Sequence, residues 1–165
     1  MILAQHDQRY LEAAQGYVEL GMFLDANEEL EMIDADSRHL SEVLAIRLQI
    51  YRALEKWELM QVVARQLALN DPDNVEWTVS WAQATRHTDS IDTARIILLN
   101  AVQAIPNAAV LHYHLACYEC LLGDVEVAKA RLQHAFKLDP DLRLKALEEQ
   151  NLKDLWNESL DTASE

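Results

Sequence analysis

Three prolines, Pro72, Pro106 and Pro140, are spaced 34 residues apart, and they are the only prolines in the 165 residues of the chain. Periods of this length are typical of proteins built from two-helix units, in which each unit buries its apolar face against its neighbours. The spacing therefore predicts an array of helix pairs, and it constrains the fold more than any other feature of the sequence.

The same period recurs in other side chains. Small or slim residues recur where two helices must approach closely, and apolar residues recur four and seven positions later, which is helical spacing on one buried face. The columns are Ala26, Met60, Ala94 and Ala128; Leu30, Ala64, Leu98 and Leu132; and Ile33, Leu67, Ala101 and Ala135. A further column holds Gly21, Glu55, Asp89 and Gly123. We expect the chain to reverse between two helices there, because glycine takes positive φ without steric cost.

Local signals predict the helices independently of the period. Ser41 is a candidate N-cap, and Leu44, Leu48 and Tyr51 follow it at helical spacing. A second helix is predicted from about Trp57 to Leu69, ending before Asp71 and Pro72 because a residue before proline disfavours the α region. Its predicted apolar stripe is Leu59, Val62, Val63, Ala64 and Leu67. Ser90 is predicted to open the matching helix of the next unit. No segment alternates with the period of two that a strand needs, so the fold class is predicted to be all-α.

These columns resemble the tetratricopeptide repeat (TPR) family. The fourth unit resembles it most, since seven of its residues agree with the family pattern: Leu115, Ala116, Gly123, Ala128, Leu132, Ala135 and Pro140. The first unit has Arg38 in place of the proline, and the third has Thr85 where an aromatic residue is usual. The resemblance implies four repeats, at residues 7–40, 41–74, 75–108 and 109–142, stacked as antiparallel helix pairs in a right-handed α-solenoid.

The predicted domain organisation is a single TPR domain over residues 1–156, followed by a flexible acidic tail at 157–165. Residues 143–156 are predicted to form a capping helix, because a stack of repeats needs a polar end. The side chains expected to cover the last repeat are Leu144, Leu147, Leu152, Leu155 and Trp156. Half of the residues are apolar, which is sufficient for a continuous core.

The charge of the chain argues against two classes of partner. Its 28 acidic and 14 basic residues give a formal net charge of −14. Phosphate binding depends on lysine and arginine, so neither nucleic acid nor an anionic membrane surface is an expected partner. The sequence shows no signal peptide and no apolar run of membrane-spanning length, so a cytoplasmic location is expected.

Two cysteines are the only hint of site chemistry. Cys117 and Cys120 share one side of a predicted helix with His114, and His87 could add a fourth ligand for zinc. Metal-binding pairs usually lie in turns, however, and redox pairs usually lie at a helix N-terminus after a strand. The favoured interpretation is two thiols packed as small apolar residues with no cofactor, while metal-linked and redox roles remain alternatives. Sequence signatures of enzymes are otherwise missing, and no catalytic role is predicted.

Function is therefore expected on the concave face, which the resemblance implies is lined by the first helix of each repeat and binds a peptide segment of a partner protein. Three glutamines form one column there, and an amide both donates to and accepts from a peptide backbone. Arginines in a second column can pair with a carboxylate. The predicted partner-binding residues are Gln15, Gln49, Arg52, Gln83, Arg86, His87, Tyr113 and His114.

Two alternatives to a non-catalytic adaptor or scaffold remain. The glutamines are also good helix formers, and they suit a wet surface without any partner. The chain could instead be a self-assembling structural unit, such as a homodimer, if Trp77 and Val110 are exposed together. Packing of Trp77 and Trp81 in the core is the favoured interpretation of those two residues.

Overall fold

The computed structural model describes residues 3–153 and 155, and every regular element in these ranges is helical, with no strand. The predicted all-α class is therefore confirmed. Trp156 and the predicted tail at 157–165 lie outside the described residues. The chain divides into two compact units, Met1–Thr88 and Asp89–Glu165.

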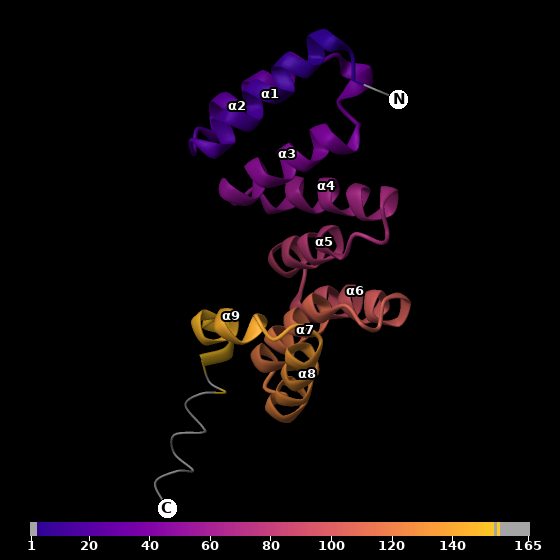
Figure 1. Cartoon of the computed structure of the whole chain (residues 1–165), viewed down its shortest axis with the longest axis vertical. Helices are drawn as coiled ribbons and strands as arrows, with labels where there is room; N and C mark the ends of the chain where they lie inside the picture. Colours follow the sequence, from indigo (N-terminus) through magenta and orange to yellow (C-terminus); the bar gives the residue numbers. More distant parts are fainter. Residues whose placement is uncertain (1–2, 154, 156–165) are drawn as a thin grey trace, which may run out of the picture. The chain divides into compact units, whose positions relative to one another are not determined.

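Within each unit consecutive helices pack side by side. In the first unit they are α1 (Gln5–Glu19), α2 (Phe23–Glu31), the short 3-10 helix η1 (Ala35–Ser37), α3 (Ser41–Ala53), α4 (Trp57–Asn70) and α5 (Val75–Thr88). In the second unit they are α6 (Ile91–Ala104), α7 (Ala109–Leu121), α8 (Val125–Leu138), α9 (Leu142–Glu148) and the 3-10 helix η2 (Gln150–Leu152). Figure 1 shows this packing for α1 with α2, α3 with α4, and α7 with α8. Each predicted repeat window holds two α-helices. That the windows form one continuous right-handed domain stays a prediction.

The columns read from the sequence are buried in both units. All four members of the small-residue column have no exposed surface. The apolar column that includes Leu30 is at most 3% exposed, and in the next column only Ala101 is half-buried. In the first unit α3 contributes to two cores: Ile46 and Ile50 pack with α1 and α2, whereas Leu48 packs with α4 and α5. Helix α3 is therefore buried on two sides, as the middle element of a stack must be.

The predicted turn column adopts the expected backbone at three of its four positions. Gly21, Glu55 and Gly123 have φ values of 75°, 53° and 87°. The left-handed conformation costs a non-glycine residue roughly 1–2 kcal/mol, so Glu55 is strained where the two glycines are not. Asp89 is the exception, since its φ is not positive. The helix that follows it, α6, is instead capped by Ser90, whose hydroxyl accepts from the backbone N–H of Thr93 at 3.1 Å.

Two local predictions need correction. Ser41 is the first residue of α3 rather than its cap, and its hydroxyl accepts from the Asn70 side chain at 3.3 Å. In α4 the buried stripe consists of Met60, Val63, Ala64 and Leu67. Leu59 and Val62, which were predicted to be buried, are 47% and 68% exposed. The buried stripe of α4 is thus rotated toward Met60. The narrow side chain of Met60 belongs to the column of small residues at which helices approach closely.

The C-terminal segment covers α7 with two of the predicted leucines, Leu152 and Leu155, and with two residues that were not predicted, Leu142 and Ala146. All four are buried. Leu144 and Leu147 were expected in this role, yet they are 74% and 64% exposed. The predicted single capping helix is in fact a seven-residue helix, α9, followed by η2. The break between them changes the face that each leucine presents.

A buried carboxylate and two partly exposed arginines connect the helices of the second unit. Glu119 of α7 has no exposed surface, and its Oε1 accepts from Arg95 Nε of α6 at 2.8 Å. Arg131 Nε of α8 lies 3.5 Å from the same oxygen. The carboxylate therefore links three helices. Removing one partner of a buried pair leaves a buried group without compensation, which is strongly destabilising.

We therefore expect Glu119→Ala to lower the free energy of unfolding by about 3 kcal/mol, measured by urea denaturation followed by circular dichroism. The matched control is Glu126→Ala on α8, because Glu126 also forms an ion pair, with Lys129, but is 87% exposed. Its loss should change stability by less than about 0.5 kcal/mol. Equal losses of unfolding free energy in the two variants would show that the buried carboxylate of Glu119 adds no more stability than an exposed ion pair.

Candidate binding surface

The glutamine column lies on the first helices of the first unit. Gln15 of α1 and Gln83 of α5 are half-buried, and Gln49 of α3 is exposed. The Gln15 amide donates to Glu19 of its own helix at 3.2 Å, an exposed contact that water can replace. The column therefore presents amide groups on α1, α3 and α5, with Gln49 the most accessible. Whether these residues bind a partner stays a prediction.

Arg52 extends from α3 toward α5. Its Nη2 donates to the Ser80 hydroxyl at 2.6 Å, and that hydroxyl in turn donates to the backbone carbonyl of Glu76 at 2.8 Å. Partial desolvation lowers the pKa of Arg52 from its ordinary value, and the charge of Glu76 opposes this shift. The guanidinium stays charged at neutral pH and keeps donors beyond the one used by Ser80. The contact with Ser80 positions the guanidinium. A carboxylate of a binding partner would therefore meet an arginine that is already partly ordered.

His87 lies against an aromatic side chain that the sequence did not place there. Its ring stacks on Trp57 of α4, with a centroid distance of 4.0 Å and an interplanar angle of 6°. Burial lowers the pKa of His87, the neighbouring Arg86 lowers it further, and Glu55 opposes both. The neutral imidazole is thus favoured in this position. His87 is exposed and Arg86 half-buried, so both belong to the surface of the first unit.

Tyr113 does not belong to an accessible surface. Its side chain has no exposed area, and Lys145 of α9 lies 5.1 Å from its ring centroid. Burial raises the pKa of its phenol, with smaller contributions from Cys117 and Glu149. The prediction that Tyr113 contacts a partner is therefore wrong for this structure, because the C-terminal segment covers that side of α7. His114 is half-buried and meets Tyr113 edge-to-face, with centroids 5.4 Å apart.

Cys117 and Cys120 are thiols outside any disulfide, and they are 2% and 8% exposed. They pack on a helix in which every position from 111 to 120 except 114 is buried. This agrees with the favoured interpretation of the pair as small apolar residues. His87 belongs to the first unit, and the two cysteines belong to the second. A zinc site that would combine His87 with Cys117 and Cys120 therefore stays an untested alternative.

Sequence reasoning missed a cavity in the first unit. It has a volume of about 520 Å³ and lies between α4 and α5. Its lining residues are Gln61, Val62, Arg65, Gln66, Leu69 and Trp81. Arg65 lies 5.9 Å from the Trp81 ring centroid. The sequence of α4 did contain a sign of this cavity. Val62 and Leu69 are apolar, but they lie beside the buried face of the helix rather than on it. Trp77 and Trp81 themselves pack against the core, as predicted.

The comparisons with known proteins show the fold. No family model and no curated protein matches the sequence. Among solved structures, a thermophilic TPR protein of Thermus thermophilus is 19% identical with a TM-score of 0.67, over 93% of this chain and 82% of that one. MamA from residue 41 to its end, from Desulfovibrio magneticus RS-1, is 15% identical with a TM-score of 0.70, over 99% and 96%. MamA of MSR-1 is 23% identical with a TM-score of 0.66, over 80% and 76%.

These likenesses, all below 25% identity, establish the architecture and nothing finer. The chain has a TPR-like, all-α solenoid fold, and the resemblance read from its columns is confirmed at that level. Among the helices of residues 3–153 and 155, none combines the length and apolar character needed to cross a membrane.

The stack of His87 on Trp57 predicts how the stability of the first unit depends on pH. Because the folded chain holds the pKa of His87 below 6.5, the unfolded chain binds more protons in the window just below that value. This contribution to stability is therefore complete above pH 6.5 and is lost as the pH falls through the folded pKa. An NMR titration of the His87 ring should give a midpoint below 6.5.

Trp57→Ala removes the ring that desolvates the imidazole and should move the midpoint of His87 upward. Trp77→Ala is the control, because Trp77 is half-buried in the same core but does not stack on His87. A midpoint that is unchanged in Trp57→Ala would contradict the assignment of the shift to this stack.

Proposed function

We propose that the chain is a non-catalytic scaffold that binds a peptide segment of a partner protein on the first-helix surface of the unit Met1–Thr88. This binding surface consists of Gln15, Gln49, Arg52, Gln83, Arg86 and His87. The observation that carries the proposal is the position of Gln49 and Arg52, which are both exposed on α3, the middle first helix of that unit. A peptide lying across α1, α3 and α5 would meet amide groups at successive helices.

The charge of the surface indicates the kind of segment. The chain as a whole carries −14, yet two arginines occupy neighbouring first helices of this unit. A guanidinium forms charge-assisted, bidentate hydrogen bonds with a carboxylate, and it is the preferred side chain for this purpose at interfaces. We therefore infer a segment that carries an acidic side chain or a C-terminal carboxylate between stretches contacted through their backbone. A reducing compartment such as the cytoplasm suits two cysteines that form no disulfide.

The test is to change Gln49, Arg52, Gln83 and Arg86 together to alanine and to compare captured proteins by quantitative mass spectrometry. Partners that bind through this surface should be depleted more than about tenfold, since the loss of two arginine contacts exceeds roughly 1.4 kcal/mol. Candidate segments from those partners are then made as peptides, and their dissociation constants are measured by fluorescence anisotropy.

The matched control is Arg65→Ala with Gln66→Ala, which removes the same two residue types from the exposed side of α4. Circular dichroism and sedimentation velocity establish that each variant keeps its fold and its association state. Partners retained equally by all variants would refute the proposed surface. A wild-type dimer that dissociates only in the α4 variant would point instead to self-assembly.

A further inference from the structure

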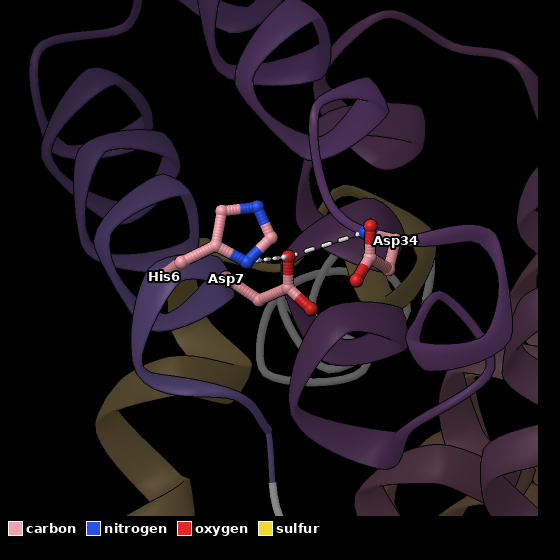
Figure 2. Close-up of side chains that lie close together, drawn as sticks. All are labelled: His6, Asp7 and Asp34. Carbon is pink, nitrogen blue, oxygen red and sulfur yellow. Dashed lines mark hydrogen bonds and ion pairs between the residues drawn. The ribbon is translucent and has the colours of Figure 1, made fainter.

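Three side chains that can bind a metal ion come together where α1 begins and α2 ends. His6 and Asp7 lie in the first turn of α1, and Asp34 lies between α2 and η1. One ligand atom from each residue lies within 4.8 Å of the other two. Figure 2 shows the His6 ring and the Asp34 carboxylate on either side of Asp7. The cluster belongs wholly to the first unit and shares no residue with the proposed binding surface.

Asp7 supplies the observation that points to a ligand. Its side chain has no exposed surface, although it is a carboxylate. One oxygen, Oδ1, accepts from the Asp34 backbone N–H at 3.2 Å and lies 3.2 Å from His6 Nδ1. The other oxygen, Oδ2, is buried and has no hydrogen-bond partner among the residues that the structure describes. Figure 2 shows both dashed lines meeting at Oδ1, with the second oxygen pointing away from the His6 ring.

A buried carboxylate oxygen without a partner is costly, because burial removes its hydration and nothing replaces it. Within residues 3–153 and 155, no lysine or arginine forms an ion pair with Asp7; its ion-pair partner there is His6, which is charged only when protonated. A divalent cation would satisfy Oδ2 and compensate the two carboxylate charges at once. Burial of Asp7 therefore favours a bound cation over an empty cluster.

The donor set selects the class of cation. An imidazole nitrogen with two carboxylate oxygens suits zinc and its first-row neighbours, whereas calcium and magnesium prefer oxygen ligands alone. Zinc binds these donors at about 2.0–2.2 Å, so ligand atoms in a tetrahedral site lie about 3.3 Å apart. His6 Nδ1 and Asp7 Oδ1 already lie 3.2 Å apart, and the widest separation, up to 4.8 Å, needs to contract by roughly 1.5 Å, which rotation of the exposed His6 and Asp34 side chains can supply.

We propose that His6, Asp7 and Asp34 form a Zn²⁺ site that joins the start of α1 to the end of α2. Asp7 is the fixed ligand, because it is buried and already hydrogen-bonded to the Asp34 backbone. His6 is the entry ligand: its side chain is 59% exposed, and its ring is oriented by an edge-to-face contact with Tyr10 at 5.6 Å. Binding would stabilise the first helix pair, since the ion binds the folded arrangement only.

The experiment uses the full chain, without a histidine tag, and titrates Zn²⁺ by calorimetry. We expect one saturable site per chain and a higher melting temperature in the presence of Zn²⁺. His6→Ala should weaken binding by at least about tenfold and abolish the thermal shift, because it removes one of three ligands. This variant should keep its fold, since His6 is exposed. Asp7→Asn is the second variant, with circular dichroism to establish that it folds.

The matched control is His39→Ala with Asp36→Asn, an exposed imidazole and an exposed carboxylate a few residues from Asp34. Binding should be unchanged in it, and also in Cys117→Ala with Cys120→Ala. Loss of binding in the cysteine variant, or equal loss in His6→Ala and in the control, would assign the metal elsewhere and overturn the proposal. Absence of saturable binding up to about 1 mM Zn²⁺ would leave Asp7 a structural carboxylate only, and would equally overturn it.

Discussion

Close approach of two helices at a column of small side chains is the contact on which the helix pairs depend. Ala26, Met60, Ala94 and Ala128 are each fully buried, and at Ala26 and Ala128 only a methyl group stands between α2 and α1 and between α8 and α7. A larger branched residue at Ala26 or Ala128 would separate the helices and leave gaps beside Leu30 or Leu132, whose dispersion contacts need native packing density. The partly buried aromatic residues, such as Tyr17 and Tyr51, then pack around this contact.

The turns between paired helices make that approach possible, and they share one hydrogen-bond pattern. The backbone N–H groups of Met22, Lys56 and Asp124 each donate back to a carbonyl five residues earlier, at 2.8–2.9 Å. This is the six-to-one bond of a Schellman motif, which requires a left-handed residue in between. Glu55 adopts that conformation despite its side chain, because the packing of α3 on α4 overrides its local preference. Only the turn at Asp89 does without it, and there a serine cap replaces the motif.

Much of this was predictable because the period is local and repeated four times. The helix bounds of α4, the buried columns and the turn positions all follow from spacing and from the chemistry of glycine, proline and serine. Within the repeats the errors were the cap at Ser41 and the stripe of α4, and the other errors arose where the period stops. The C-terminal segment has no earlier repeat to align with, so Leu144 and Leu147 were assigned by helical spacing alone, and the break after Glu148 was invisible. Tyr113 was misplaced for the same reason, since the segment that covers it lies beyond the last repeat.

Polar clusters were the least predictable part of the molecule, because their members are distant in sequence and occupy no shared column. Glu119 stands where the first two repeats have tyrosine, and only the contacts of Arg95 and Arg131 explain a charge at that core position. Asp7 and Asp34 are 27 residues apart and belong to no motif. In both cases burial removes the hydration of a carboxylate, a cost that a neighbouring cation must offset. Two arginines provide that cation at Glu119, whereas at Asp7 only His6 is present among the described residues. Oε2 of Glu119 is buried without a hydrogen-bond partner, as Oδ2 of Asp7 is, so the difference between the two sites is one of available positive charge. Two arginines balance Glu119, and this is why Asp7 is the carboxylate that calls for an added cation.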